Sequence, residues 1–320
     1  MVKKYVVFAP PFDEKSGGIV CLHKLCHLIN ETGLEAYIYP SFENIEINRS
    51  NWLLPVLRFT REIYRKFIPF KLNENWNTPI IRNKKNFSKN PDWVVIYYEQ
   101  VFGNPLTLKN VVRWFLHTPG YHTHKVYYGF NELHIKFNTS VKDFVYPFSR
   151  LSNNHLKIIH YPLNHYNLKE LSSNRNGTAY CIRKGKGKAI VHDLNNSILI
   201  DNLSHEKIAK LFKSVKMFVS YDCYTAYSVF AVLCGCISVV IPDPDVTEEE
   251  WYPELSDRYG IAYGFENIKK AEETKHLVLP RIISELKDSE KSVLRFTKEV
   301  EEYFQLPRYN FYRNNDIKKL

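Results

Sequence analysis

Short runs of β-branched and aromatic residues alternate with amphipathic stretches along this chain. In the first half, buried strands are predicted for residues 4–11, 35–40, 92–99 and 111–117, and further strands for 142–148 and 156–162. Between the first two, Ile19, Leu22 and Leu25 begin a helical repeat that Gly33 closes. A basic, aromatic stretch at 57–68 is a further predicted helix.

The pattern restarts after a polar segment, residues 163–176, which is the best linker candidate. Strands are then predicted at 177–182, 189–193, 197–201, 216–222, 237–243 and 261–264, with helices over 204–215 and 225–235 and a long one ending near Phe304. Strands that alternate with helices indicate an α/β fold with largely parallel sheets. Two such halves predict two Rossmann-like domains that face one another across a cleft.

The net charge of the chain limits the classes of partner that it suits. With 44 Lys and Arg against 34 Asp and Glu, the net charge of +10 suits a nucleic acid, a phosphorylated small molecule or an anionic membrane face. No apolar run is long enough to span a bilayer, and residues 1–18 indicate a first strand rather than a signal peptide, so we expect a cytoplasmic protein. No zinc-type Cys/His spacing occurs. The basic residues form no single stripe, which argues against nucleic acid as the partner.

Three segments carry candidate chemistry. Ser16, Gly17 and Gly18 stand between the first strand and helix, where glycines let the backbone approach an anion. The loop 183–188 (RKGKGK) follows the first strand of the second half and predicts a phosphate cradle. The third, 220–228 (SYDCYTAYS), is a polar turn leading into a helix; its hydroxyls suit a diphosphate or simply cap the helix.

Together these motifs resemble those of GT-B glycosyltransferases. Arg183 and Lys188 stand five positions apart on the loop after the first strand of the second half, as in the family's nucleotide-binding domain. Residues 219–243 resemble its strand–turn–helix, with a small-Gly-small step into a strand. In the first half, GNPL followed by VVRWFLHTPG is similar to bacterial surface-polysaccharide (capsule, O-antigen or exopolysaccharide) glycosyltransferases.

The resemblance implies a nucleotide-diphosphate-sugar donor, with UDP as the expected nucleotide and a glycan or lipid-linked acceptor. The donor-binding residues it indicates are Gly17, Gly18, Arg183, Lys188, Asp222, Tyr224, Thr225 and Ser228. It implies no metal and no other cofactor, because basic side chains neutralise the leaving group in this fold. It also implies domains at 1–165 and 170–288, and a C-terminal segment, 289–320, that crosses back to the N-terminal domain.

One departure concerns the retaining members of the family, which carry two glutamates with seven residues between them. Asp222 and Phe230 stand at those positions here, and Phe230 cannot accept a hydrogen bond from a ribose. The stereochemistry of transfer therefore stays open. A non-catalytic nucleotide- or sugar-binding homologue and a basic nucleic-acid-binding protein remain as alternatives.

The catalytic base is expected at strand ends of the first half, where Asp13, Glu99 and His117 are the candidates. The structural alternatives are an ion pair of Glu99 with Arg113 and a place for His117 as a satisfied core histidine. Three further residues, His122, His124 and Glu132, are candidates for an acceptor pocket. The D-x-D spacing of Asp243 and Asp245 lies in a Pro-rich loop and is a weak metal candidate. The basic aromatic segment 57–70 and the tail suit peripheral contact with a membrane.

Overall fold

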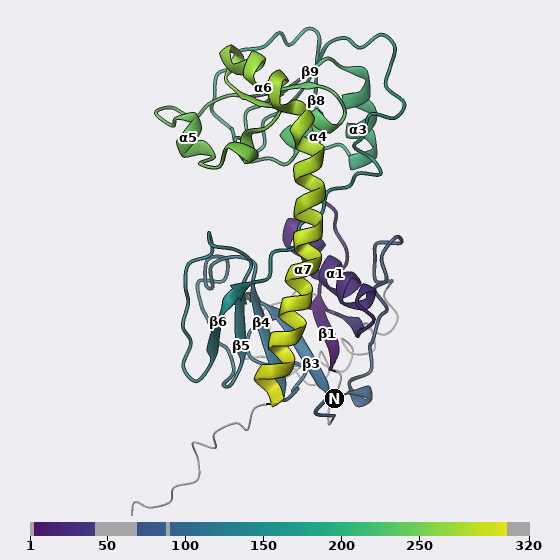
Figure 1. Ribbon diagram of the computed structural model, residues 1–320, viewed down its shortest axis with the longest axis vertical. Helices are drawn as coiled ribbons and strands as arrows, with labels where there is room; N and C mark the ends of the chain where they lie inside the picture. The colour runs from purple at the N-terminus through teal and green to yellow at the C-terminus, as the bar shows by residue number, and fades with distance from the viewer. Residues whose placement is uncertain (1–2, 42–68, 88–89, 306–320) are drawn as a thin grey trace, which may run out of the picture. The chain divides into compact units, whose positions relative to one another are not determined.

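The computed structural model describes residues 3–41, 69–87 and 90–305, which divide into two compact units. Unit 1 comprises residues 1–160 and 286–320, and unit 2 comprises residues 161–285. Each unit is built on one wholly parallel sheet, so both are α/β domains (Figure 1). Among the described residues, no helix is both long enough and apolar enough to cross a bilayer.

The sheet of unit 1 has six parallel strands in the order β2-β1-β3-β4-β5-β6. The strands are β1 (Lys4–Ala9), β2 (Glu35–Pro40), β3 (Trp93–Tyr98), β4 (Asn110–Phe115), β5 (Leu133–Lys136) and β6 (Arg150–His155). Strands β1, β3 and β4 are buried along nearly their whole length, which explains their continuous apolar sequences.

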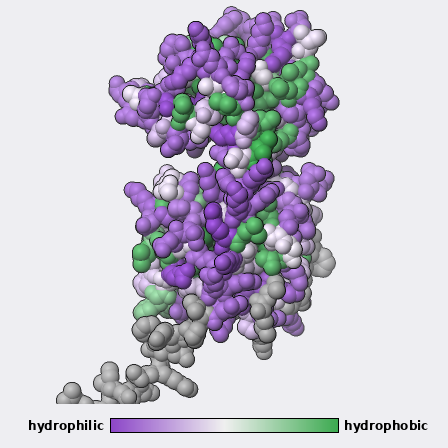
Figure 2. All heavy atoms as spheres, in the orientation of Figure 1, coloured by the Kyte–Doolittle hydropathy of each residue, from purple (hydrophilic) through white to green (hydrophobic). Residues whose placement is uncertain are grey.

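Two helices, α1 (Gly17–Glu31) and α7 (Val278–Gln305), cover one face of this sheet (Figure 1). Leu22, Leu25 and Ile29 of α1 pack in one cluster with Val293 and Phe296 of α7 and with the strands. The predicted return of the C-terminal helix to the first domain is therefore observed. Its surface along unit 1 is largely hydrophilic, as expected for an amphipathic helix (Figure 2).

Unit 2 carries five parallel strands in the order β11-β10-β9-β7-β8. They are β7 (Thr178–Cys181), β8 (Ser197–Leu199), β9 (Met217–Ser220), β10 (Ile237–Val240) and β11 (Ile261–Tyr263). Its helices are α3 (His205–Ser214), α4 (Tyr227–Leu233), α5 (Glu248–Trp251) and α6 (Ile268–Thr274). As expected, the Ser204 side chain caps α3 by accepting the N–H of Lys207.

Three predicted strands are wrong. Residues 142–148 form no strand, since Val145 and Phe148 are exposed and Phe148 has a left-handed backbone (φ 57°). In 156–162, the backbone N–H groups of Lys157 and Ile159 donate to serine side chains of α7 instead of to a neighbouring strand. Residues 189–193 also lie outside the sheet. Strands β5 and β6 were not predicted from the sequence, because β5 is short and β6 has a polar sequence.

Candidate functional site

Each sheet has one place where successive connections leave in opposite directions. In unit 2 this point lies between β7 and β9, since the chain runs from β7 out to β8 and then back to β9. Loops that follow the two strands diverge there and leave room for a ligand at the carboxyl edge. The loops after β7 and β9 hold the second and third predicted motifs.

Arg183 follows β7 and is held in an unusual conformation. Its φ of 40° lies in the left-handed region, which costs a non-glycine residue about 1–3 kcal/mol. Asp201 offsets part of this cost by accepting the backbone N–H groups of Ile182 and Arg183 at 3.1 and 2.9 Å. The guanidinium lies 5.4 Å from the ring centroid of Tyr227, and Nε is 3.7 Å from Asp222 Oδ2. The side chain stays 39% exposed, so it can reach a ligand.

Gly185 brings the loop against the turn after β9. A Cβ at this position would overlap the backbone carbonyl of Tyr221. Only glycine permits this approach, and the loop is consequently fixed over the end of β9.

Lys188 is part of an internal ion pair. Its ammonium group lies 2.7 Å from Asp243 Oδ1, donates to the carbonyl of Ile241 at 2.7 Å and lies 3.1 Å from Cys223 Sγ. Burial lowers the pKa of Lys188, but the bonds to Asp243 and Cys223 outweigh it, so the pKa is raised. Lys188 therefore fastens the loop to the end of β10. Its partner Asp243 belongs to the D-x-D sequence, and no three His, Cys, Asp or Glu side chains of the described residues gather as metal ligands.

The turn after β9 is ordered by its own side chains. Asp222 is buried and accepts the N–H of Tyr224 at 3.1 Å, while Thr225 Oγ1 accepts the N–H of Tyr227 at 3.3 Å. Ser228 Oγ is buried without a hydrogen-bond partner, whereas the Tyr224 ring is exposed. Asp222 thus orients Arg183 and shapes the turn. The structure brings Arg183, Lys188 and Asp222 to one edge of the sheet.

The corresponding point in unit 1 lies between β1 and β3. Asp13 is exposed in the loop after β1, where Oδ1 accepts the N–H of Lys15 at 3.0 Å. Gly17 and Gly18 begin α1, and a Cβ on Gly18 would lie 3.6 Å from the side chain of Leu116. The start of α1 therefore adjoins the end of β4.

Glu99 directly follows β3 and is buried. Its carboxylate accepts the N–H of Leu116 at 3.1 Å, the N–H of His117 and the side-chain amide of Gln100 at 3.2 Å. Burial raises the pKa of Glu99, and these hydrogen bonds reduce the shift. The carboxylate thus joins the end of β3 to the end of β4.

His117 is exposed, which excludes the core-histidine alternative. Its Nδ1 accepts the N–H of Thr118 at 2.8 Å. In the neutral ring the proton therefore resides on Nε2, which makes Nε2 a donor. This geometry suits hydrogen bonding to a substrate oxygen better than proton abstraction.

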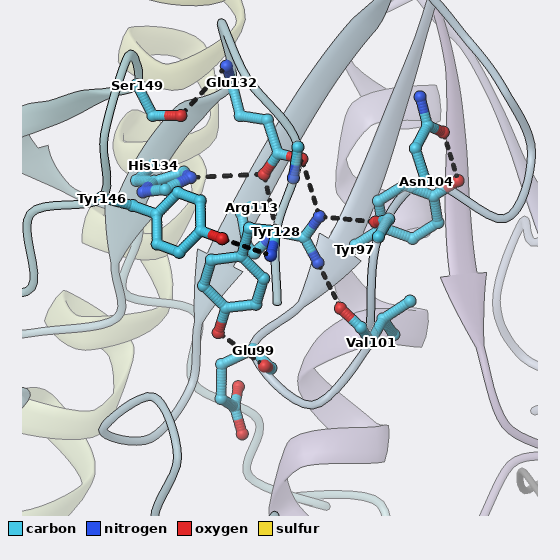
Figure 3. Close-up of polar contacts among 12 residues, drawn as sticks. Tyr97, Glu99, Val101, Asn104, Arg113, Tyr128, Glu132, His134, Tyr146 and Ser149 are labelled. Carbon is cyan, nitrogen blue, oxygen red and sulfur yellow. Dashed lines mark hydrogen bonds and ion pairs between the residues drawn. The ribbon is translucent and has the colours of Figure 1, made fainter. Parts of the chain in front are cut away.

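The alternative pairing of Glu99 with Arg113 is wrong. Arg113 is fully buried and makes a bidentate ion pair with Glu132, with distances of 2.7 and 2.9 Å (Figure 3). It also donates to the carbonyls of Val101 and Gly103, which follow Glu99 in the chain.

Two more residues complete this buried cluster. His134 Nε2 lies 3.2 Å from Glu132, and Tyr128 donates its hydroxyl to the carbonyl of Glu99 at 2.6 Å (Figure 3). Burial opposes ionisation of Glu132, but His134 and Arg113 outweigh it and lower its pKa to about 2. Glu132 is therefore an internal counter-ion and not part of an acceptor pocket. The sequence did contain a signal for this cluster. Arg113 stands within the apolar sequence of β4, and a buried arginine needs an acidic partner.

No protein-family model matches the sequence, and no curated protein matches it either. Solved structures similar to the chain include MurG of Acinetobacter baumannii at 9% identity and a TM-score of 0.31, covering 94% of this chain and 99% of that one. The sucrose-phosphate synthase of Thermosynechococcus elongatus matches at 10% identity and 0.37, with coverages of 94% and 95%. The T4 phage β-glucosyltransferase matches at 11% and 0.40, with coverages of 94% and 97%.

The identities are 11% or lower and the TM-scores are 0.40 or lower, so these matches assign no function to the chain.

Proposed function

We propose that the chain is a glycosyltransferase that takes its sugar from a nucleotide-diphosphate donor, bound at the carboxyl edge of the unit 2 sheet. The observation that carries the proposal is Arg183. Its guanidinium stands at the point between β7 and β9, on a strained backbone position and over the Tyr227 ring. Strain of this kind gathers at functional sites.

The charge of the loop supports an anionic ligand. Lys184 and Lys186 are exposed and make no ion pair with any residue that the structure describes, whereas Asp243 neutralises Lys188. Among the residues that the structure describes, Arg183 forms an ion pair only with Asp222, whose Oδ2 is 3.7 Å from its Nε. A guanidinium matches the geometry of phosphate oxygens and stabilises the charge that develops on a departing diphosphate.

We assign the diphosphate to Arg183, Lys184 and Lys186, with Thr225 and the exposed Tyr224 beside it. Lys188 and Asp222 then support the loop and Arg183 rather than contact the donor directly. The proposal needs no metal ion, since these cations neutralise the leaving group. UDP is the first nucleotide to test, because the resemblance of the sequence motifs implies a UDP-sugar donor.

A thermal-shift experiment tests the donor site. UDP, GDP, CMP, dTDP and ADP are added separately, with magnesium or with EDTA. A ligand at a hundred times its Kd stabilises by about 2.7 kcal/mol. We expect UDP to shift the melting curve equally in both buffers, and Arg183→Ala to abolish the shift. Lys210→Ala, which removes an exposed cation from α3, is the matched control and should keep it.

The pattern of results separates the alternatives. No shift with any nucleotide would remove the donor proposal, and salt-dependent retention on DNA or RNA would then favour nucleic-acid binding. A UDP shift without release of UDP from UDP-sugars would indicate a non-catalytic nucleotide-binding protein. A shift seen only with magnesium would contradict metal-free binding.

The acceptor we propose is a glycan or lipid-linked sugar of surface polysaccharide synthesis, reached by a cytoplasmic enzyme at the membrane face. This rests on the resemblance of the first-half motifs. The basic aromatic stretch predicted to contact the membrane lies outside the described residues except for its last two, and so does the tail from residue 306 onward. Cosedimentation with anionic vesicles, compared with neutral ones, tests this part separately.

A further inference from the structure

Three aromatic rings gather on the loop after β4, at the carboxyl edge of the unit 1 sheet. The ring centroid of Tyr121 lies 4.2 Å from that of His117 and 4.9 Å from that of His122, and the two imidazoles are 5.0 Å apart. Tyr121 nevertheless remains 64% exposed. An exposed ring group at a sheet edge where ligands bind is a candidate recognition surface.

The loop that carries the rings is tied to the core at its start and is ordered by turns of its own. At its start, Glu99 holds the backbone N–H groups of Leu116 and His117 from within the core. Farther along, the N–H of Tyr121 donates to the carbonyl of Thr118 at 3.1 Å, and the N–H of His124 donates to the carbonyl of Gly120 at 2.8 Å. The backbone that carries the rings is thus ordered before any ligand arrives, which reduces the entropy lost on binding.

The polar atoms around the rings are available. The bond from Thr118 N–H to His117 Nδ1 leaves Nε2–H of the neutral ring as a donor. The Tyr121 hydroxyl and the ring nitrogens of His122 make no hydrogen bond to another residue in the described part of the chain. The surface therefore combines an aromatic face with donors and acceptors at its rim.

We propose that Tyr121, His117 and His122 form the acceptor subsite and that it takes a sugar ring. A pyranose has an apolar face of C–H groups, which suits the Tyr121 ring, and a rim of hydroxyls, which suits the imidazole nitrogens. Glu99 is then a positioning residue, since it acts through the backbone of Leu116 and His117. The inference rests on the proposed glycosyl transfer and names the residues that hold the sugar acceptor.

The chemistry favours a sugar over a nucleobase. A base stacks between or upon broad aromatic faces and needs few edge contacts. Here the planes of Tyr121 and His122 are inclined by 87° and those of His117 and His122 by 58°, so the rings present edges and nitrogen atoms rather than one flat platform. Several polar atoms around one ring face match the many hydroxyls of a sugar.

NMR of the full chain with ¹⁵N-labelled histidine rings tests the subsite. The probes are the methyl glycosides of glucose, galactose, mannose and N-acetylglucosamine, with uridine as the nucleobase probe. His117→Gln and His122→Gln assign the two ring signals. We expect at least one glycoside to shift both signals saturably. Tyr121→Ala should weaken that Kd by about tenfold, the size of an aromatic contact, and Tyr121→Phe by no more than about twofold. Tyr127→Ala, which removes a 67% exposed tyrosine farther along the same β4–β5 connection, is the control.

The proposal falls if none of the four glycosides shifts the signals, if Tyr121→Ala binds as tightly as the parent, or if uridine shifts them more than every glycoside does. UDP added to the same sample keeps the two proposals apart. Glycoside shifts without Arg183-dependent UDP binding would remove the donor site alone. UDP binding without glycoside shifts would remove the subsite alone.

Discussion

Both sheets have one point at which the direction of their connections reverses, but the side chains at the carboxyl edges of the two sheets differ in charge and burial. In unit 2 the strand order β8-β7-β9 brings exposed cations and a glycine-rich loop to the edge. In unit 1 a buried carboxylate follows β3, and exposed rings follow the neighbouring strand β4. The charged groups of unit 1 satisfy one another inside the domain, as Arg113 and Glu132 do. Those of unit 2 are left partly uncompensated. Topology therefore determines where a ligand site lies, and the loops determine which ligand it suits.

The largest effect is expected from breaking the internal charge pair of unit 1. Arg113→Met would leave the Glu132 carboxylate buried without its cation, and loss of one partner of such a pair costs about 3–5 kcal/mol. Urea unfolding measures the loss. Lys4→Met, which removes an exposed ion pair with Glu35, is the control and should change stability little. Equal losses in the two variants would contradict the distinction drawn between buried and exposed charge.

Gly185→Ala tests the close approach in unit 2. The added Cβ must displace the loop or the Tyr221 carbonyl, and overpacking of this kind costs about 1–3 kcal/mol. Because the loop also carries Arg183, we expect weaker UDP binding by isothermal titration. A variant with parent stability and parent affinity would show that the loop is not fixed by this contact.

A pH dependence distinguishes the buried carboxylate of unit 1. Since burial raises the pKa of Glu99 above its ordinary 4.5, the folded state holds the proton more tightly than the unfolded state does. The parent protein should therefore lose stability relative to Glu99→Gln as the pH rises from below 4.5 through the raised pKa. Denaturant unfolding of both proteins at several pH values gives this difference. A difference that grows in favour of the parent as the pH rises would contradict the burial argument.

The smallest effect is expected at the start of α1. Gly17 has open space at its Cβ position and no left-handed φ, so Gly17→Ala should stabilise the fold by about 0.4–1 kcal/mol. If Gly17 is needed so that the ligand can approach the backbone closely, the same variant should lose transfer activity while its melting temperature rises. Full activity would instead indicate an ordinary turn between strand and helix.

Sequence patterns predicted the parts of the fold that are continuous in apolar residues. β1, β3 and β4 are buried on both faces, so their runs of Val, Ile and Tyr stand out. β6 is an edge strand with the polar sequence RLSNNH, which no periodicity distinguishes from a loop. Residues 156–159 look like a strand but bond to serines of α7, more than a hundred residues away in the chain.

The sequence predicted the place of the candidate residues in the fold better than the contacts that their side chains make. The loop 183–188 lies where its place after a strand predicted, because parallel topology brings strand ends to one edge. The ion pair of Lys188 with Asp243 was not predictable, since it joins the ends of β7 and β10. Likewise, the sequence shows Glu99 as an isolated acid at the end of a strand. Only the fold shows that its carboxylate accepts a backbone N–H group at the end of β4.

The helix α7 has a consequence for synthesis of the chain. Residues 293–300 complete the core of unit 1, whose other members lie in the first 160 residues. On the ribosome, unit 2 emerges whole and can fold while unit 1 still lacks this helix. Unit 1, whose strands are synthesised first, is therefore completed last. In a nascent chain stalled near residue 285, the apolar part of the unit 1 sheet that α7 covers would be exposed to chaperones.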